Sequence, residues 1–149
     1  MVGIDIDIAQ RRPLRLGLAL ADGIEWDCDS TPVRVRGVDL GEIWRRSGRL
    51  RRAHPGVDVV AEIDVVIAAD ARTARAMFDC TQANSGTLVY VGTPAGLAGL
   101  IADIHALGIA DGALLIPQTS AVAHLIRDAV LPALQTSRPS APTAEARPA

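Results

Sequence analysis

The sequence predicts an α/β fold of about four βα units with mostly parallel strands, preceded by an extra N-terminal strand or hairpin. Two observations indicate this class. Residues 87–133 read as strand, helix, strand and helix, and residues 113–116 form an apolar run without polar alternation, which is typical of a strand buried on both faces of a parallel sheet. With 149 residues, nearly half of them apolar, the chain is long enough for one domain with a core.

The segment 87–133 is the clearest module. The apolar run 88–91 stops at Gly92, and Thr93 and Pro94 then supply an N-cap residue and a proline at the first helical position. Gly108 stands where a left-handed C-cap is expected. One helical stripe of apolar residues lies between them: Leu97, Leu100, Ile101, Ile104 and Leu107. With the next strand, this predicts a right-handed βαβ unit.

The N-terminal part predicts strands more weakly. Residues 2–8 alternate apolar residues with Gly and Asp, as a half-buried edge strand does, and residues 14–20 form a second candidate strand. The turn-rich linker 21–32 is too short for a full crossover helix, which takes about a dozen residues. Strand 14–20 therefore pairs with 33–36 either as a hairpin or in parallel.

A helix is predicted over 40–50, with Asp39 as its cap and Trp44 on its apolar stripe. This region is the one basic part of the chain: Arg34, Arg36, Arg45, Arg46, Arg49, Arg51 and Arg52. Two interpretations are open, a solvated helix face or a phosphate or polyanion patch. The net charge of −2 and the lack of interleaved aromatic residues argue against nucleic-acid binding.

Residues 57–68 alternate as a long strand with two different faces. One face is entirely apolar and should lie under helices, whereas the face with Glu62 and Asp64 should point to a barrel interior or an open cleft. These two carboxylates could perform acid–base chemistry. Because no His, Lys or Tyr can be placed beside them, no catalytic residue is assigned. Asp70 then caps a helix that runs through Phe78.

Three motifs in this order resemble the C-terminal half of the luciferase-like flavin-dependent monooxygenase superfamily. They are Tyr90-Val-Gly-Thr-Pro94 opening a helix, Gly108-Ile-Ala-Asp-Gly112 before the last strand, and Val130-Leu-Pro-Ala-Leu134 in the last helix. The similarity covers about residues 30 to 135. It implies a (β/α)8 barrel that binds FMN or the deazaflavin coenzyme at the carboxyl ends of its strands and performs redox chemistry on an organic substrate.

The first half of such a barrel has no counterpart in the chain, since about five strands cannot close an eight-stranded barrel. We therefore expect a partial (β/α) barrel in residues 1–134, followed by a disordered tail in 135–149 that is rich in proline. The resemblance implies a truncated flavin- or deazaflavin-dependent oxidoreductase or monooxygenase relative. The alternative is a non-catalytic partial-barrel protein that acts as a homo-oligomer or with a partner chain.

Two strand ends offer candidate binding residues. Gly92 and Thr93 are the best candidates for phosphate contact, because phosphate often sits at a helix N-terminus in barrels, although a plain N-cap also explains Thr93. The loop Pro117–Ser120 is the second candidate. Two cysteines without metal-site or redox spacing predict no metal site. No apolar run reaches the ~20 residues of a membrane span, and the acidic N-terminus is unlike a signal peptide, so we expect a cytoplasmic protein.

Overall fold

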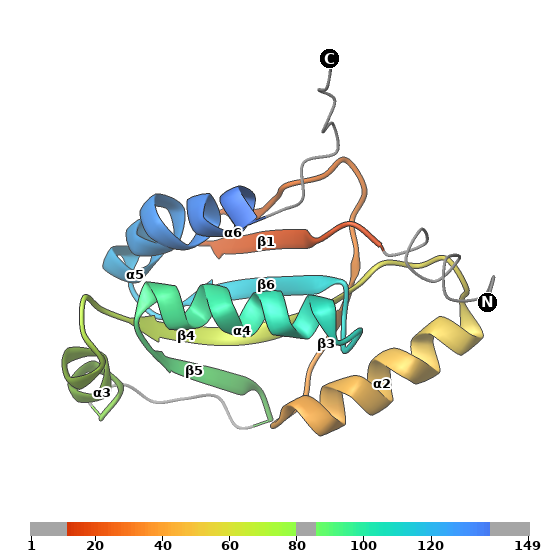
Figure 1. Ribbon diagram of the computed structural model, residues 1–149, viewed down its shortest axis with the longest axis horizontal. Helices are drawn as coiled ribbons and strands as arrows, with labels where there is room; N and C mark the ends of the chain where they lie inside the picture. The colour runs from red at the N-terminus through yellow and green to blue at the C-terminus, as the bar shows by residue number, and fades with distance from the viewer. Residues whose placement is uncertain (1–11, 80–85, 138–149) are drawn as a thin grey trace, which may run out of the picture.

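The computed structural model describes residues 12–79 and 86–137 (Figure 1). Its strands are β1 (Arg15–Leu20), β2 (Gly23–Trp26), β3 (Val33–Val35), β4 (Val59–Ile67), β5 (Leu88–Gly92) and β6 (Gly112–Pro117). Its helices are α2 (Leu40–Ala53), α3 (Ala71–Asp79), α4 (Pro94–Ala106) and a last helix made of α5 (Ser120–Leu125), the π-helical turn η1 (Ile126–Val130) and α6 (Leu131–Ser137). The strand predicted over 2–8 lies outside the described residues.

The strands form one curled, half-barrel sheet, which makes this a mixed α/β fold. Its order is β2-β1-β6-β4, and the far edge of β4 is shared by β3, beside Val59–Ala61, and β5, beside Ile63–Ile67. The pair β1–β2 is antiparallel, and the other described pairs are parallel. The four predicted βα units are thus confirmed, and the extra N-terminal element, predicted as a strand or hairpin, is a hairpin of β1 and β2.

Two details of pairing differ from expectation. The hairpin partner of β1 is β2, with Leu20 opposite Gly23, and not segment 33–36, which joins β4 in parallel. A two-residue turn suffices for a hairpin, so the linker 21–32 holds a strand of its own. In addition, β6 lies between β1 and β4, whereas each strand of a (β/α)8 barrel pairs with the next strand along the chain.

The main core lies between the sheet and the helices α2, α4 and α5 to α6. Strand β4 is buried along its whole length, and Figure 1 shows α4 lying across β4 and β6. The predicted apolar face of β4 is confirmed, because its residues belong to this core: Val59, Ala61, Ile63, Val65 and Ile67. The helices add Ile43, Leu97, Ile101, Ile104, Val122 and Ile126.

The helix termini follow the predicted caps. Thr93 and Asp39 accept hydrogen bonds from the N–H groups of Gly96 and Glu42, at 3.1 and 2.8 Å. Gly108 has φ +71°, and the Ile109 N–H donates to the Ile104 carbonyl at 3.0 Å, which is a Schellman motif.

Two features of the helices differ from the sequence prediction. Trp44 is not on the buried stripe of α2, since 61% of its surface is exposed; Ile43 and Ser47 form that stripe instead. The last helix runs on to Ser137, so residues 135–137 are helical. Its π-helical turn directly precedes the Leu131-Pro132 step, where a proline ring needs room against the preceding turn.

None of the helices in residues 12–79 and 86–137 combines the length and the apolar character that crossing a bilayer requires.

Candidate functional site

The face of the sheet that points away from the main core carries the two predicted carboxylates. Glu62 and Asp64 alternate with the core residues of β4 and retain only 6% and 1% exposure. Their register places Leu114 of β6 beside Glu62, and Ile116 and Val89 on either side of Asp64. We call this surface, made of Trp26, Arg34, Arg36, Glu62, Asp64 and Leu114, the carboxylate face.

Two arginines compensate the charge of Glu62. The Arg36 Nε lies 3.1 Å from Glu62 Oε1, and the Arg34 Nε lies 3.5 Å from Oε2. Both arginines come from β3 or the residue just after it, which runs parallel to β4. Since both guanidiniums are more than one third exposed, these pairs orient Glu62 more than they stabilise the fold.

Asp64 has no such partner. Both of its carboxylate oxygens are buried, and neither makes a hydrogen bond to any described residue. Burial raises the pKa of Asp64 above its usual value, and the charge of Glu62 adds to this, whereas Arg36 opposes it. The neutral form of the Asp64 carboxyl is thereby favoured over the charged form. A buried carboxyl without a partner is rare in folded proteins and often marks a functional site.

Apolar groups surround these carboxyls. The ring of Trp26 lies over Gly17, where an added Cβ would meet the ring carbon Cζ3 at 2.5 Å, and Leu114 stands beside it. Val60 and Val66 of β4 point to the same face and are fully or nearly fully buried. The carboxylate face is therefore a mostly dry surface with one compensated and one uncompensated acid.

The Gly92–Thr93 junction lies at the carboxyl end of β5, where the sequence places it, but much of its hydrogen-bonding capacity is already used. The Thr93 hydroxyl caps Gly96, Pro94 has no N–H, and the Gly92 carbonyl accepts from the Ala68 N–H at 3.1 Å. The phenol of Tyr90 lies against Gly92 and Gly96. In the first turn of α4, the Ala95 N–H is the donor that these contacts do not use. Phosphate contact by Gly92 and Thr93 therefore stays a prediction.

The other candidates serve local structure. In the Pro117–Ser120 loop, the Thr119 hydroxyl accepts from the Val122 N–H at 3.2 Å as the cap of α5. His105 Nε2 lies 2.6 Å from the Arg12 carbonyl oxygen, and His54 and His124 are exposed. In the described part of the chain, no histidine makes a hydrogen bond or ion pair with Glu62 or Asp64, and no catalytic triad or dyad is formed.

Sequence reasoning found the two carboxylates but missed their neighbours. The signal for the arginines was present, because Arg34 and Arg36 are two residues apart on a strand, as Glu62 and Asp64 are. Two such rows on neighbouring strands can form cross-strand pairs. Trp26 gave no signal, because the short strand β2 was not predicted.

Comparison with models of known protein families finds no family that matches the chain, and comparison with curated proteins finds no matching relative.

Two places in the structure bear on flavin or deazaflavin binding, the carboxylate face and the Gly92–Thr93 junction. Both Asp64 oxygens are buried without a described hydrogen-bond partner, and Leu114 is only 1% exposed, so Trp26 is the apolar residue of this face with surface left for contact. At the junction, the Ala95 N–H of the first helical turn is not used by the contacts described above.

Proposed function

We propose that the chain is a shortened flavin- or deazaflavin-dependent oxidoreductase relative, of the monooxygenase-like kind, whose cofactor ring lies on the carboxylate face. The observation that carries this proposal is the buried Asp64 carboxyl, which has no hydrogen-bond partner in the described structure. The resemblance of the motifs adds support, whereas the order of the strands in the sheet differs from that of a (β/α)8 barrel. Gly92 and Thr93 are the proposed contacts of the phosphate.

The chain's own residues have distinct roles in this proposal. When bound, the flavin carries out the electron or hydride transfer itself. Asp64 in its neutral form donates a hydrogen bond to a ring acceptor, and Glu62 stays in place through Arg34 and Arg36. Trp26, which lies over Gly17 beside Leu114, excludes water from one side of the ring.

A second candidate function, from another class, is a non-catalytic partial-barrel protein that associates with itself or with a partner chain. The sheet favours it, because β2 ends the sheet on one side and β3 and β5 end it on the other. In the described residues no further strand pairs with these edges. Open edges with free backbone groups readily accept another chain.

Gel filtration of the purified protein with added FMN or deazaflavin separates these functions. The oxidoreductase proposal expects saturable binding and co-elution of the cofactor absorbance, and weaker binding by Asp64→Asn. The exposed Asp103→Asn on α4 is the matched control and should bind as the wild type does. A colourless oligomer that ignores both cofactors would contradict the oxidoreductase proposal and support the second function.

A further inference from the structure

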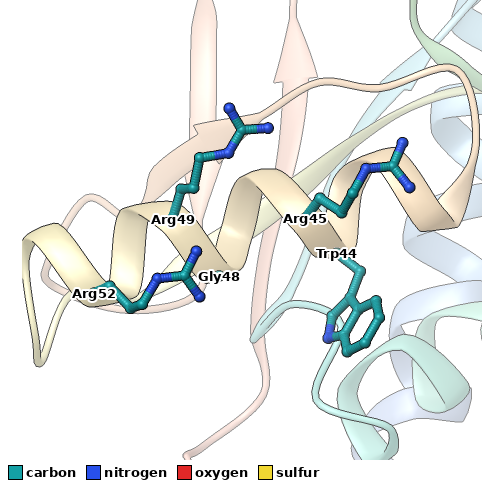
Figure 2. Close-up of a pocket in the computed structure, with 5 residues that line it drawn as sticks. All are labelled: Trp44, Arg45, Gly48, Arg49 and Arg52. Carbon is teal, nitrogen blue, oxygen red and sulfur yellow. The ribbon is translucent and has the colours of Figure 1, made fainter.

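The outward face of helix α2 carries a groove. The residues that line it have no role in the proposed oxidoreductase function. It is lined by Trp44, Arg45, Gly48, Arg49 and Arg52 and has a volume of about 360 Å³ (Figure 2). All five residues lie on one helix, at the steps that place side chains on one face. The groove is therefore a surface feature of α2, on the opposite side from Ile43 and the core.

Its three arginines are unpaired, unlike their neighbours on the same helix. Arg46 pairs with Glu42 at 3.1 Å, and Arg51 pairs with Asp111 at 3.0 Å. In the described structure no acidic side chain pairs with Arg45, Arg49 or Arg52, and all three are exposed. Their positive charges are thus available to a negatively charged ligand.

Gly48 and Trp44 give this basic face a shape. Trp44 is one of the few large apolar side chains that the described surface exposes, at 61%. A Cβ at Gly48 would already meet an Arg52 guanidinium nitrogen at 3.5 Å, so the absent side chain leaves the groove open. Figure 2 shows Gly48 between the indole of Trp44 and the guanidinium of Arg52. The groove thus combines one apolar wall with three cations.

We propose that this groove binds an acidic segment of a partner protein, with an apolar residue of that segment against Trp44. Arginine forks bind carboxylates in a bidentate manner, and Trp and Arg are the residues that most often dominate protein interfaces. Arg45, Arg49 and Arg52 are spaced by four and three residues, a stripe of about 10 Å. Glutamates at the same steps on one face of a partner helix match this stripe.

The observations favour a protein over a nucleic acid. The groove has a single aromatic residue instead of a row of stacking platforms, and its three cations extend over only about 10 Å. The proposal does not depend on cofactor binding by the carboxylate face, and none of the groove residues belongs to that face. Failure of either proposal leaves the other intact.

The test uses the full chain and a fluorescein-labelled helical peptide with glutamates at these steps and one leucine. Fluorescence anisotropy should show saturable binding that weakens as salt is added. The double variant R45E/R49E should lose about tenfold in affinity or more, and Trp44→Ala should also bind more weakly. The matched control is R72E/R75E, which makes the same charge change on exposed arginines of α3 and should bind as the wild type does.

Several results would overturn the proposal. One is an equal loss of affinity in both double variants, which would reveal a general charge effect, and another is no binding of the peptide. Tighter binding of polyphosphate or single-stranded DNA than of the peptide would make the ligand a polyanion. Self-association that R45E abolishes, seen by sedimentation, would make the occupant a second copy. Because these side chains are exposed, we expect each variant to fold as the wild type does. Circular dichroism verifies this.

Discussion

Asp64 is the residue whose environment is hardest to explain by folding alone. Its neighbour Glu62 is compensated by two arginines, whereas Asp64 is more deeply buried and has no described partner. Burying a polar group without a hydrogen bond costs folding free energy. A protein that retains such a group therefore gains something else from it, and a bound ligand that completes its hydrogen bonds is the simplest gain.

The raised pKa of Asp64 predicts the sign of a pH effect on stability. Above the unfolded-state pKa, near 3.9, the unfolded chain loses a proton that the folded protein retains, so this residue makes the fold less stable as the pH rises. The asparagine side chain in Asp64→Asn cannot ionise, so the variant does not lose stability in this way as the pH rises. The free energy of unfolding of the variant, relative to wild type, should therefore increase as the pH rises above about 4. Urea unfolding at several pH values measures it, and a difference independent of pH would contradict the prediction.

Asp111 shows that part of the motif before the last strand is structural. Its carboxylate accepts from the Val59 N–H at 2.8 Å and pairs with Arg51 at 3.0 Å, with only 3% of the residue exposed. Next to it, a Cβ at Gly112 would collide with the Arg15 carbonyl of β1. The Asp-Gly pair thus fixes the start of β6 against β4, β1 and α2, and its presence in the sequence is explained without any ligand.

We therefore expect Asp111→Asn to destabilise the fold by about 2 kcal/mol or more, because it leaves Arg51 without its counter-ion. The exposed Asp103→Asn should change stability by less than about 0.5 kcal/mol. Chemical denaturation of both variants gives the comparison. Equal stability of the two would show that the Asp111 contacts contribute little.

At the scale of elements, the start of α4 depends on the contact between Tyr90 and Gly96. Alanine in place of a helical glycine usually stabilises a protein, but a Cβ at Gly96 would overlap the Tyr90 hydroxyl. We expect Gly96→Ala to cost about 1 kcal/mol and Tyr90→Phe alone to be almost neutral. In the double variant the cost should be smaller, because the hydroxyl is gone and the nearest remaining ring carbon, Cζ, is 3.2 Å from the added Cβ. Thermal unfolding of the four proteins forms a double-mutant cycle, and additive effects would rule out this contact as the cause.

The sequence predicted elements well where the signal was local. The Thr93 cap, the buried Leu97, Ile101 and Ile104 of α4 and the Gly108 C-cap lie within one continuous stretch, and the two faces of β4 follow from simple alternation. Leu107, predicted on the same stripe, is instead the C-cap residue and is 72% exposed. Strand β2 was missed because four residues with weak alternation carry little signal. Trp44 was misplaced because its size suggested burial, whereas neighbouring Ile43 occupies the buried position.

At the scale of the whole molecule, strand order was beyond local reasoning. That β6 lies between β1 and β4 depends on contacts between residues far apart in the chain. The composition of the candidate site also depends on strand order, because the carboxylate face brings together β2, β3, β4 and β6. Glu62 and Asp64 could be predicted from one strand, but the pairing of Glu62 with Arg34 and Arg36 and the place of Trp26 over Gly17 depend on which strands are neighbours.

This strand order predicts how protection from hydrogen exchange is distributed. Strand β4 is hydrogen-bonded on both edges and fully buried, so its amides should exchange slowest, and those of the edge strands β2 and β3 should exchange faster. Hydrogen exchange followed by mass spectrometry at low and high protein concentration tests this order and the open edges together. If a second copy completes the sheet, protection of β2, β3 or β5 rises with concentration while that of β4 stays constant. Unchanged edge protection over that range would contradict self-association through the sheet.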